Sequence, residues 1–215
     1  MLLGLLSTNI VLFIAFIIAL LIAITLHEAS HAAVATLLGD PTAKYQGRLS
    51  LNPLRHLDPL GTLMLLIAGF GWGKPVQYNP ALLKKGGRWG PFLIAVAGPI
   101  TNFIIAAFFA AIYKIFFTFI HSTNFEIFIY IIIEINIVLM IFNLLPIPPL
   151  DGSKIFYAIP GISDEFITNF ERIGVFVLFA LIFLNILGIL PIFNLVIIPV
   201  INFFLQVIFK LPPAF

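Results

Sequence analysis

Long apolar runs separated by short polar breaks dominate the hydrophobic pattern of this chain. Crossing a bilayer as a helix takes roughly 20 mainly apolar residues. Four runs meet that length: Leu6–Leu38, Pro91–Ile120, Phe125–Leu145 and Phe166–Leu190. A fifth run, Ile192–Phe209, is interrupted by Pro199 and predicts a weaker span. The pattern therefore predicts an all-α polytopic membrane protein with about five to six transmembrane helices.

Local signals mark the ends of these runs. The first ends at the sequence Gly-Asp-Pro of residues 39–41, and the third ends at Pro146-Ile-Pro-Pro. Ser163 is a predicted N-cap of the fourth run, with two acidic residues in the turn that follows. The N-terminus has neither the basic flank nor the small-residue cleavage site of a signal peptide, so we predict that the first run is a retained membrane helix.

The segment Gly39–Gly90 is the most polar part of the chain and holds seven of its eleven basic residues. Because basic loops stay on the cytoplasmic side, this segment is predicted to be cytoplasmic. Its apolar stretch Leu60–Phe70 is too short to cross comfortably and predicts a re-entrant or partial helix. Two pieces, Lys44–Leu51 and Trp72–Tyr78, favour extended structure and predict a small irregular β-sheet near the active site. No repeat or separate soluble segment is present, so residues 1–215 are expected to form one membrane-embedded domain.

Composition agrees with a bilayer environment. The chain of 215 residues is 61% hydrophobic and 9% charged, with a mean hydropathy of +1.16, whereas soluble domains carry about 25% charged residues. The lipid bilayer is therefore an expected partner. A net charge of +2 spread along the chain does not indicate nucleic-acid binding. The absence of cysteine excludes disulfides and thiolate metal ligands.

The first apolar run contains the sequence His27-Glu-Ala-Ser-His31. Four helical residues advance about 400°, so the two histidines lie one turn apart on the same face. That spacing allows both imidazoles to bind one metal ion, with Glu28 beside them as a general base for a nearby water. The alternative is a set of interhelical hydrogen bonds. However, each ionisable group within a membrane helix costs at least about 2.5 kcal/mol, and a shared metal would account for three of them.

A catalytic zinc usually has three protein ligands. The candidates for the third are His56, His121, Glu134 and Asp151. His121 falls on the predicted outer loop, and Glu134 is expected mid-membrane, where an ion pair with Lys114 is the simpler role. Asp151 follows three prolines that break the third long helix at its cytoplasmic end, where irregular backbone must line a cavity or be buried. Asp151 is therefore the predicted third ligand, and it reaches the histidines only if Leu60–Phe70 does not cross the membrane.

Two asparagines precede Asp151 on one helical face. Asn143 is eight residues before it, and Asn136 is seven residues before Asn143. An amide close to the metal can donate a hydrogen bond to the oxyanion of a tetrahedral intermediate. We predict that role for Asn143 and a structural interhelical bond for Asn136.

These motifs resemble those of the site-2 protease family of intramembrane metalloproteases. The resemblance rests on five segments in the family's order, which begin at His27 (HEASH), His56 (HLDPLGT), Gly71 (GWGKPV), Ala97 (AGPITN) and Asn143 (NLLPIPPLDG). It is closest to the compact prokaryotic branch without a PDZ or CBS domain. The resemblance implies that His27, His31 and Asp151 hold one Zn²⁺ per chain, that Glu28 and Asn143 are catalytic, and that His56 and Asn102 lie near the site.

The predicted function is hydrolysis of peptide bonds within or beside the transmembrane segments of membrane-protein substrates. The protein is expected in the cell membrane, as a multi-pass protein whose active site faces the cytoplasm. An unwound substrate could pair with an exposed edge near Gln46–Leu51 or Trp72–Tyr78. The alternatives are a divalent-metal transporter, a non-catalytic membrane zinc-binding protein and a prenyl-protein processing enzyme with the same helix motif. A single compact site with an adjacent base favours the protease over the transporter.

Overall fold

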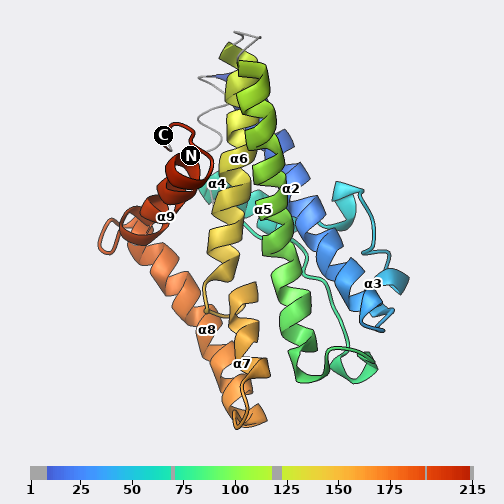
Figure 1. Ribbon diagram of the computed structural model, residues 1–215. Coiled ribbons are helices and arrows are strands. Elements are labelled where there is room, and N and C mark those ends of the chain that lie inside the picture. Colours follow the sequence, from blue (N-terminus) through green and yellow to red (C-terminus); the bar gives the residue numbers. More distant parts are fainter. Residues whose placement is uncertain (1–8, 69–70, 118–122, 192, 214–215) are drawn as a thin grey trace.

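Four long helices form the frame of the protein in a computed structural model that describes residues 9–68, 71–117, 123–191 and 193–213 (Figure 1). They are α2 (Ile10–Leu37), α5 (Gly90–Phe117), α6 (Thr123–Leu144) and α8 (Asp164–Ile186). Over the described residues these are the helices long and apolar enough to cross a membrane. The prediction of an all-α membrane protein is confirmed, but the residues that the structure describes contain four such helices instead of the predicted five to six spans.

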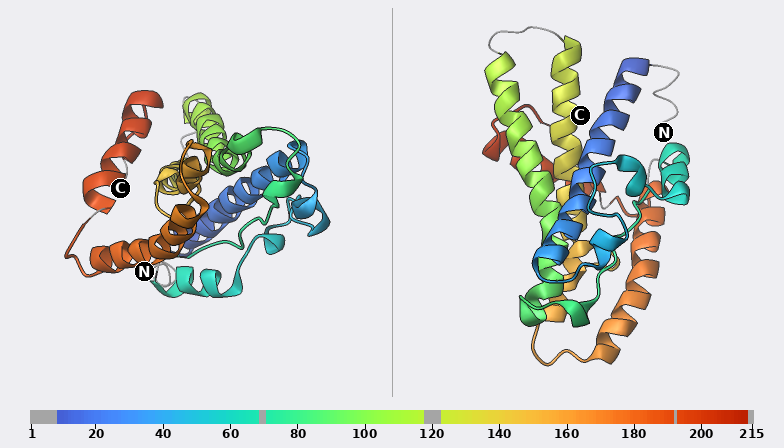
Figure 2. Two further views of the ribbon diagram at one scale, coloured as in Figure 1. Left: turned by 90° about the horizontal axis from the view of Figure 1, so that it is seen from below. Right: turned by 90° about the vertical axis from the view of Figure 1, so that its right-hand side faces the viewer.

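Helices α2, α5 and α6 pack side by side along most of their lengths (Figures 1 and 2). Ala19 and Ala23 of α2 are fully buried against Ile105 of α5 and Ile132 of α6. Small side chains allow membrane helices to approach closely, which increases van der Waals contact where lipid offers no hydrophobic driving force. This three-helix bundle is the most buried part of the protein, and the metal-ligand motif of α2 lies within it.

The last apolar run is an irregular helix rather than a span. It consists of a π-helical segment (Phe193–Ile197), α9 (Ile198–Asn202) and a second π-helical segment (Phe203–Ile208). Ile192, where the run was predicted to begin, lies outside the described residues. The buried side chains of the irregular helix pack against α6 in one apolar cluster that includes Ile197, Ile201 and Leu205. At about 1.5 Å per residue this helix is too short for a hydrocarbon core about 30 Å thick, which explains why the fifth span fails.

Helix α8 begins as the sequence predicts and stands apart from the bundle (Figure 2). The Ser163 side chain accepts a hydrogen bond of 3.2 Å from the backbone N–H of Phe166, which confirms the N-cap. Its inner face contacts the rest of the protein through Leu178 and Ile182, which pack around Leu150. Most of its remaining surface is exposed and apolar, as expected for a helix in contact with lipid.

The predicted β-sheet between α2 and α5 is wrong for the residues described. This segment contains α3 (Thr42–Tyr45), α4 (Pro59–Ala68) and three short 3₁₀ turns, at Pro53–Arg55, Pro80–Leu82 and Gly87–Trp89. One isolated antiparallel bridge joins Leu57 to Gly73. Local hydrogen bonds from Thr42 to the Asp40 side chain start a helical turn that runs into the first predicted strand, and Pro75 removes a donor from the second piece.

The short apolar stretch 60–70 forms the ten-residue helix α4 as far as Ala68, and residues 69 and 70 lie outside the described residues. Ten residues make about 15 Å of helix, half of what a crossing needs. The prediction of a partial helix is therefore confirmed. After α6, the chain turns back through a 3₁₀ segment (Asp151–Lys154) and α7 (Ile155–Ala158) toward the bundle.

Candidate active site

Three predicted metal ligands meet inside the bundle. His27 and His31 lie one turn apart on α2, with ring centroids 4.6 Å apart and planes nearly perpendicular. Asp151 Oδ2 lies 3.1 Å from Nε2 of His27 and 3.3 Å from Nε2 of His31. The three ligand atoms lie within 4.8 Å of one another, and both histidines are buried. Side chains that are 120 residues or more apart in the sequence thus form one group that can hold a metal ion.

The loop after α6 brings Asp151 to the histidines. Residues 146–150 leave the helix at the first proline and turn back through short-range hydrogen bonds, such as Leu150 N–H to the Ile147 carbonyl at 2.9 Å. The next turn is held by Ser153, whose N–H and hydroxyl both donate to the Leu150 carbonyl. Leu150 is itself buried against α8. The proline-rich sequence therefore ends the helix and fixes the turn from which Asp151 projects.

Each histidine is oriented by a hydrogen bond at its second ring nitrogen. His31 Nδ1 lies 2.7 Å from the backbone carbonyl of Ile94, and His27 Nδ1 lies 2.6 Å from Oδ1 of Asn102. Both partners belong to α5, and Asn102 is completely buried. A partner at one imidazole nitrogen fixes the ring orientation and leaves the other nitrogen for a metal. Here the free nitrogens are the two Nε2 atoms that face Asp151.

The geometry around Asp151 suits a metal better than a direct ion pair. Its Oδ2 atom is buried and has no partner at hydrogen-bond geometry, although both Nε2 atoms are near. Ligands about 2.0–2.1 Å from a tetrahedral zinc lie about 3.3 Å from one another, close to the spacings found here. Burial alone would raise the pKa of Asp151, but the neighbouring imidazoles of His31 and His27 outweigh it and hold the pKa below its ordinary value.

Gly98 of α5 leaves the space that this group occupies. A Cβ atom built there would overlap Cε1 of His27 and would lie 2.5 Å from His31 Nε2 and 2.6 Å from His27 Nε2. Contacts this short require something to shift, and both imidazoles are held by hydrogen bonds at Nδ1. Glycine at position 98 thus lets the two imidazoles lie directly against the α5 backbone.

Glu28 lies beside the metal group and contacts a buried arginine. Its Oε2 atom is 3.5 Å from Nη2 of Arg48, which is 3% exposed. The Arg48 guanidinium also donates to the backbone carbonyls of Arg55 and Lys74, so it joins two loop segments. Burial lowers the pKa of Arg48, and the Glu28 carboxylate opposes that shift. Arg48 was predicted only as one of many cytoplasmic charges, and no local sequence signal marks it as buried.

A cavity of about 470 Å³ opens beside these groups. Its polar lining comes from His27, Glu28, Asn143 and Asp151. Its apolar walls come from α2, α6, α8 and the segment after α4, and the rings of Trp72 and Phe179 meet edge to face across it at 6.3 Å. The half-buried Asn143 donates one amide hydrogen to the Leu139 carbonyl at 3.0 Å, which leaves its second amide hydrogen available.

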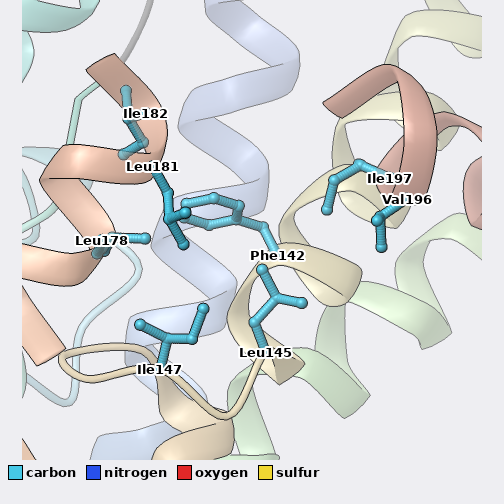
Figure 3. Close-up of a pocket in the computed structure, with 8 residues that line it drawn as sticks. All are labelled: Phe142, Leu145, Ile147, Leu178, Leu181, Ile182, Val196 and Ile197. Carbon is cyan, nitrogen blue, oxygen red and sulfur yellow. The ribbon is translucent and has the colours of Figure 1, made fainter. Parts of the chain in front are cut away.

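A second, smaller cavity of about 170 Å³ lies on the far side of Phe142 and is entirely apolar (Figure 3). The Phe142 side chain extends from α6 toward Leu178 and Leu181 of α8, with Val196 and Ile197 on the opposite side (Figure 3). Phe142 and Leu178 line both cavities. The wall between α6 and α8 is thus formed by side chains with gaps on both sides, not by close helix packing.

Of the other candidate ligands, the two that the structure describes lie outside the group of His27, His31 and Asp151. His56 is fully buried, but its Nε2 atom lies 2.7 Å from the Ser50 carbonyl within the loop. Glu134 lies on α6 outside the group formed by His27, His31 and Asp151. His121 lies outside the described residues. Among the three candidates that the structure describes, Asp151 is the one that lies with the two histidines.

Comparison with known proteins assigns the chain to a family. Residues 112–185, which include Asn143 and Asp151, match Peptidase family M50. The chain is 43% identical over 180 residues to "Putative zinc metalloprotease YwhC" of Bacillus subtilis, a match that covers 80% of this chain and 81% of that protein. The chain belongs to peptidase family M50, the site-2 protease family.

A less similar relative also carries the name of a zinc metalloprotease. The chain is 32% identical over 146 residues to "Putative zinc metalloprotease Rip2" of Mycobacterium tuberculosis, covering 65% of this chain and 55% of that protein. No solved structure matches the chain. The resemblance inferred from the sequence motifs is thus confirmed at the level of the family.

Two residues near the M50 site had no assigned role in the sequence. Asn102 was expected near the site, and its contact with His27 Nδ1 now supplies the reason. Gly98 belongs to the same Ala97–Asn102 segment, which the sequence singled out only as one of the five motifs of the resemblance. A glycine four residues before a buried asparagine, on a helix facing the histidines, was the available signal for both.

Proposed function

We propose that this M50 chain is a zinc metalloprotease that hydrolyses peptide bonds within or beside the transmembrane segments of membrane proteins. The observation that supports this most directly is the convergence of three ligand atoms next to a cavity that is lined by two of these residues, His27 and Asp151, and by Glu28. In this proposal His27, His31 and Asp151 hold one zinc ion. When bound, zinc supplies a Lewis acid that polarises the scissile carbonyl and makes water more acidic.

The chain's own residues have distinct proposed roles in the reaction. Glu28 lines the cavity next to His27 and takes a proton from the attacking water, then passes it to the leaving amine. Asn143 lines the same cavity and donates its second amide hydrogen to the oxyanion that forms on the scissile carbonyl. Trp72 and Phe179 form part of the apolar lining of this cavity.

A membrane-protein substrate fits the surroundings of the site. The two ligating histidines lie in a 28-residue apolar helix, and the cavity walls are mainly apolar. A transmembrane helix must unwind to expose its carbonyls, and the irregular segment after α4 lies beside the cavity, where we propose that it pairs with the unwound stretch. The basic loops at this end of the bundle favour the cytoplasmic side of the cell membrane for the site.

The proposal is tested by comparing the parent protein with Glu28→Gln in detergent, on a panel of single-span substrates. Glu28→Gln is expected to reduce cleavage by about 10²–10⁴-fold while bound zinc stays at one per chain. Glu134→Gln is the matched control, because it removes another carboxylate from a membrane helix outside the metal group, and it should cleave like the parent. Cleavage that survives Glu28→Gln would exclude the glutamate as the base. Zinc binding without cleavage of any span by the parent would favour the transporter or the non-catalytic protein.

A further inference from the structure

The two metal-facing histidines are oriented through hydrogen-bond paths of different length. His31 Nδ1 contacts the backbone carbonyl of Ile94 directly at 2.7 Å. His27 Nδ1 contacts an amide side chain instead, Oδ1 of Asn102 at 2.6 Å. An amide can present either an acceptor or a donor to a ring nitrogen, so the Asn102 side chain alone does not fix which nitrogen of His27 holds the proton.

A second buried amide fixes the orientation of Asn102. The Asn102 Nδ2 atom lies 2.8 Å from Oδ1 of Asn136 on α6, and Asn136 Nδ2 lies 2.8 Å from the Ile132 carbonyl one helical turn earlier. Both asparagines have no exposed surface, so water cannot replace either partner. The path from His27 therefore crosses from α2 through α5 to a main-chain oxygen of α6.

The direction of every bond on this path follows from its last atom. A carbonyl oxygen only accepts, so Asn136 must turn its N–H toward Ile132 and its Oδ1 toward Asn102. Asn102 must then donate from Nδ2, which leaves its Oδ1 as the acceptor for His27. Consequently Nδ1 of His27 holds the hydrogen, and the lone pair of the neutral ring is on Nε2, the atom that faces Asp151.

We propose that Asn136 is a positioning residue for the metal site, which acts through Asn102 to fix the tautomer of His27 in its metal-binding form. The inference rests on the proposed zinc site but not on the proposed proteolysis. It also replaces the purely structural role that the sequence suggested for Asn136. Both histidines then depend on a main-chain carbonyl, His31 on that of Ile94 directly and His27 on that of Ile132 through two amides.

The test measures the rate at which zinc passes from the loaded protein to EDTA in detergent. Asn102→Ala is expected to speed zinc release by about 10–100-fold, as loss of a direct partner of a metal ligand does, and Asn136→Leu by roughly 3–10-fold. If Asn136 acts through Asn102, adding Asn136→Leu to Asn102→Ala produces no further increase. Ile137→Ala is the matched control: it alters the adjacent, fully buried residue of α6, so it should lower the unfolding temperature and leave zinc release unchanged.

The outcomes separate this inference from the proposed function. Zinc release from Asn136→Leu at the parental rate, or an undiminished effect of that substitution in the Asn102→Ala background, would overturn the inference while the zinc site stands. A parent protein that binds no zinc would overturn both. Should Asn136→Leu fail to fold, Asn136→Ser replaces it, because its hydroxyl can still donate to the Ile132 carbonyl but ends one bond short of Asn102. The same acceleration is expected, and its absence would count equally against the inference.

Discussion

The two sides of the active-site cavity differ in how firmly they are built. On one side, α2, α5 and α6 enclose the histidines, and half of the most apolar stretch of α6 is buried. On the other side stands α8, of which only 17% of the corresponding stretch is buried. The side that holds the metal group has little freedom to move, whereas the side facing the rest of the cavity is attached by few contacts. Rigid ligands and a loosely held wall suit a site that must keep a metal while admitting a large substrate.

The largest expected difference between the two sides is in zinc binding after a glycine on each side is replaced by alanine. Gly98→Ala should abolish stoichiometric zinc binding, or weaken it at least about tenfold, because the new Cβ overlaps both Nε2 positions. The comparison substitution is Gly174→Ala on α8, whose Cβ would lie 2.5–2.6 Å from the Pro148 ring. It should displace α8 and leave zinc in place. Zinc content after gel filtration distinguishes them, and equal loss from both variants would show that the two sides are not independent.

Core truncations compare the packing of the two sides directly. Ile133→Ala removes a fully buried side chain from α6 and should lower the free energy of unfolding by about 2–4 kcal/mol. Ile182→Ala removes an equal volume from α8 and should cost about half as much, because α8 can move to fill the space. Denaturation in mixed detergents gives both values. A greater loss from Ile182→Ala would mean that α8 is held as firmly as the bundle.

A buried carboxylate just after α2 accepts hydrogen bonds from the following loop, so the stability of the bundle side is expected to depend on pH. Asp40 is fully buried, and hydrogen bonds from Thr42 and from the Asn79 N–H outweigh the effect of burial and lower its pKa below the ordinary 3.8. A lowered folded-state pKa gives stability that is present above about pH 4 and is lost as the pH falls through the folded-state value.

Asp40→Asn should therefore reduce stability by about 1–2 kcal/mol at neutral pH, because an amide replaces the charged acceptor. The difference from the parent should shrink as the pH is lowered below about 4, where the parent also loses its carboxylate. Unfolding temperatures of both proteins, measured from acidic to neutral pH, provide the comparison. If the difference in unfolding temperature stays constant over this pH range, the effect of the substitution comes from the changed hydrogen-bond geometry of the side chain and not from the loss of its charge.

The smallest effect is expected on the α8 side. Lys154 Nζ lies 2.6 Å from Glu171 Oε1, and the Tyr157 hydroxyl donates to the same oxygen, which joins the loop after Asp151 to α8. Because Glu171 is 43% exposed, the pair is well screened, and Glu171→Gln should change the free energy of unfolding by no more than about 1 kcal/mol. Zinc release should be unaffected. An effect as large as that of Ile133→Ala would make this pair a principal attachment of α8.

The sequence predicted the elements whose signals are local and periodic. The long helices, the Ser163 cap, the partial helix near residue 60 and the two-histidine face of α2 follow from run length, capping and helical spacing. The proline break combined with the topology predicted Asp151 as the third member of the group, and the structure places it beside the two histidines. The irregular sheet was wrong, because the hydrogen bonds of Asp40 to Thr42 and the turns after it compete with strand pairing in ways that alternation does not reveal.

Contacts between distant elements were out of reach of the sequence. Nothing near Arg48 indicates that it will be buried against Glu28, since its partners are two carbonyls from later parts of the loop. The same holds for the bond between Asn102 and Asn136, whose geometry depends on how α5 and α6 are rotated about their axes. Helix rotation is set by packing over the whole interface, and a single sequence does not define it.

The separation of the ligands along the chain has a consequence for biosynthesis. His27 and His31 are made early, Asp151 follows after two further long helices, and Phe179, which completes the cavity wall, comes later still. Chains are synthesised from the N-terminus at about 5–20 residues per second, so the two histidines precede the third ligand by several seconds. A nascent or truncated chain lacking residue 151 cannot assemble the ligand set. In the proposed zinc site, the order of the sequence thus keeps the ligand set incomplete until most of the protein has been inserted into the membrane.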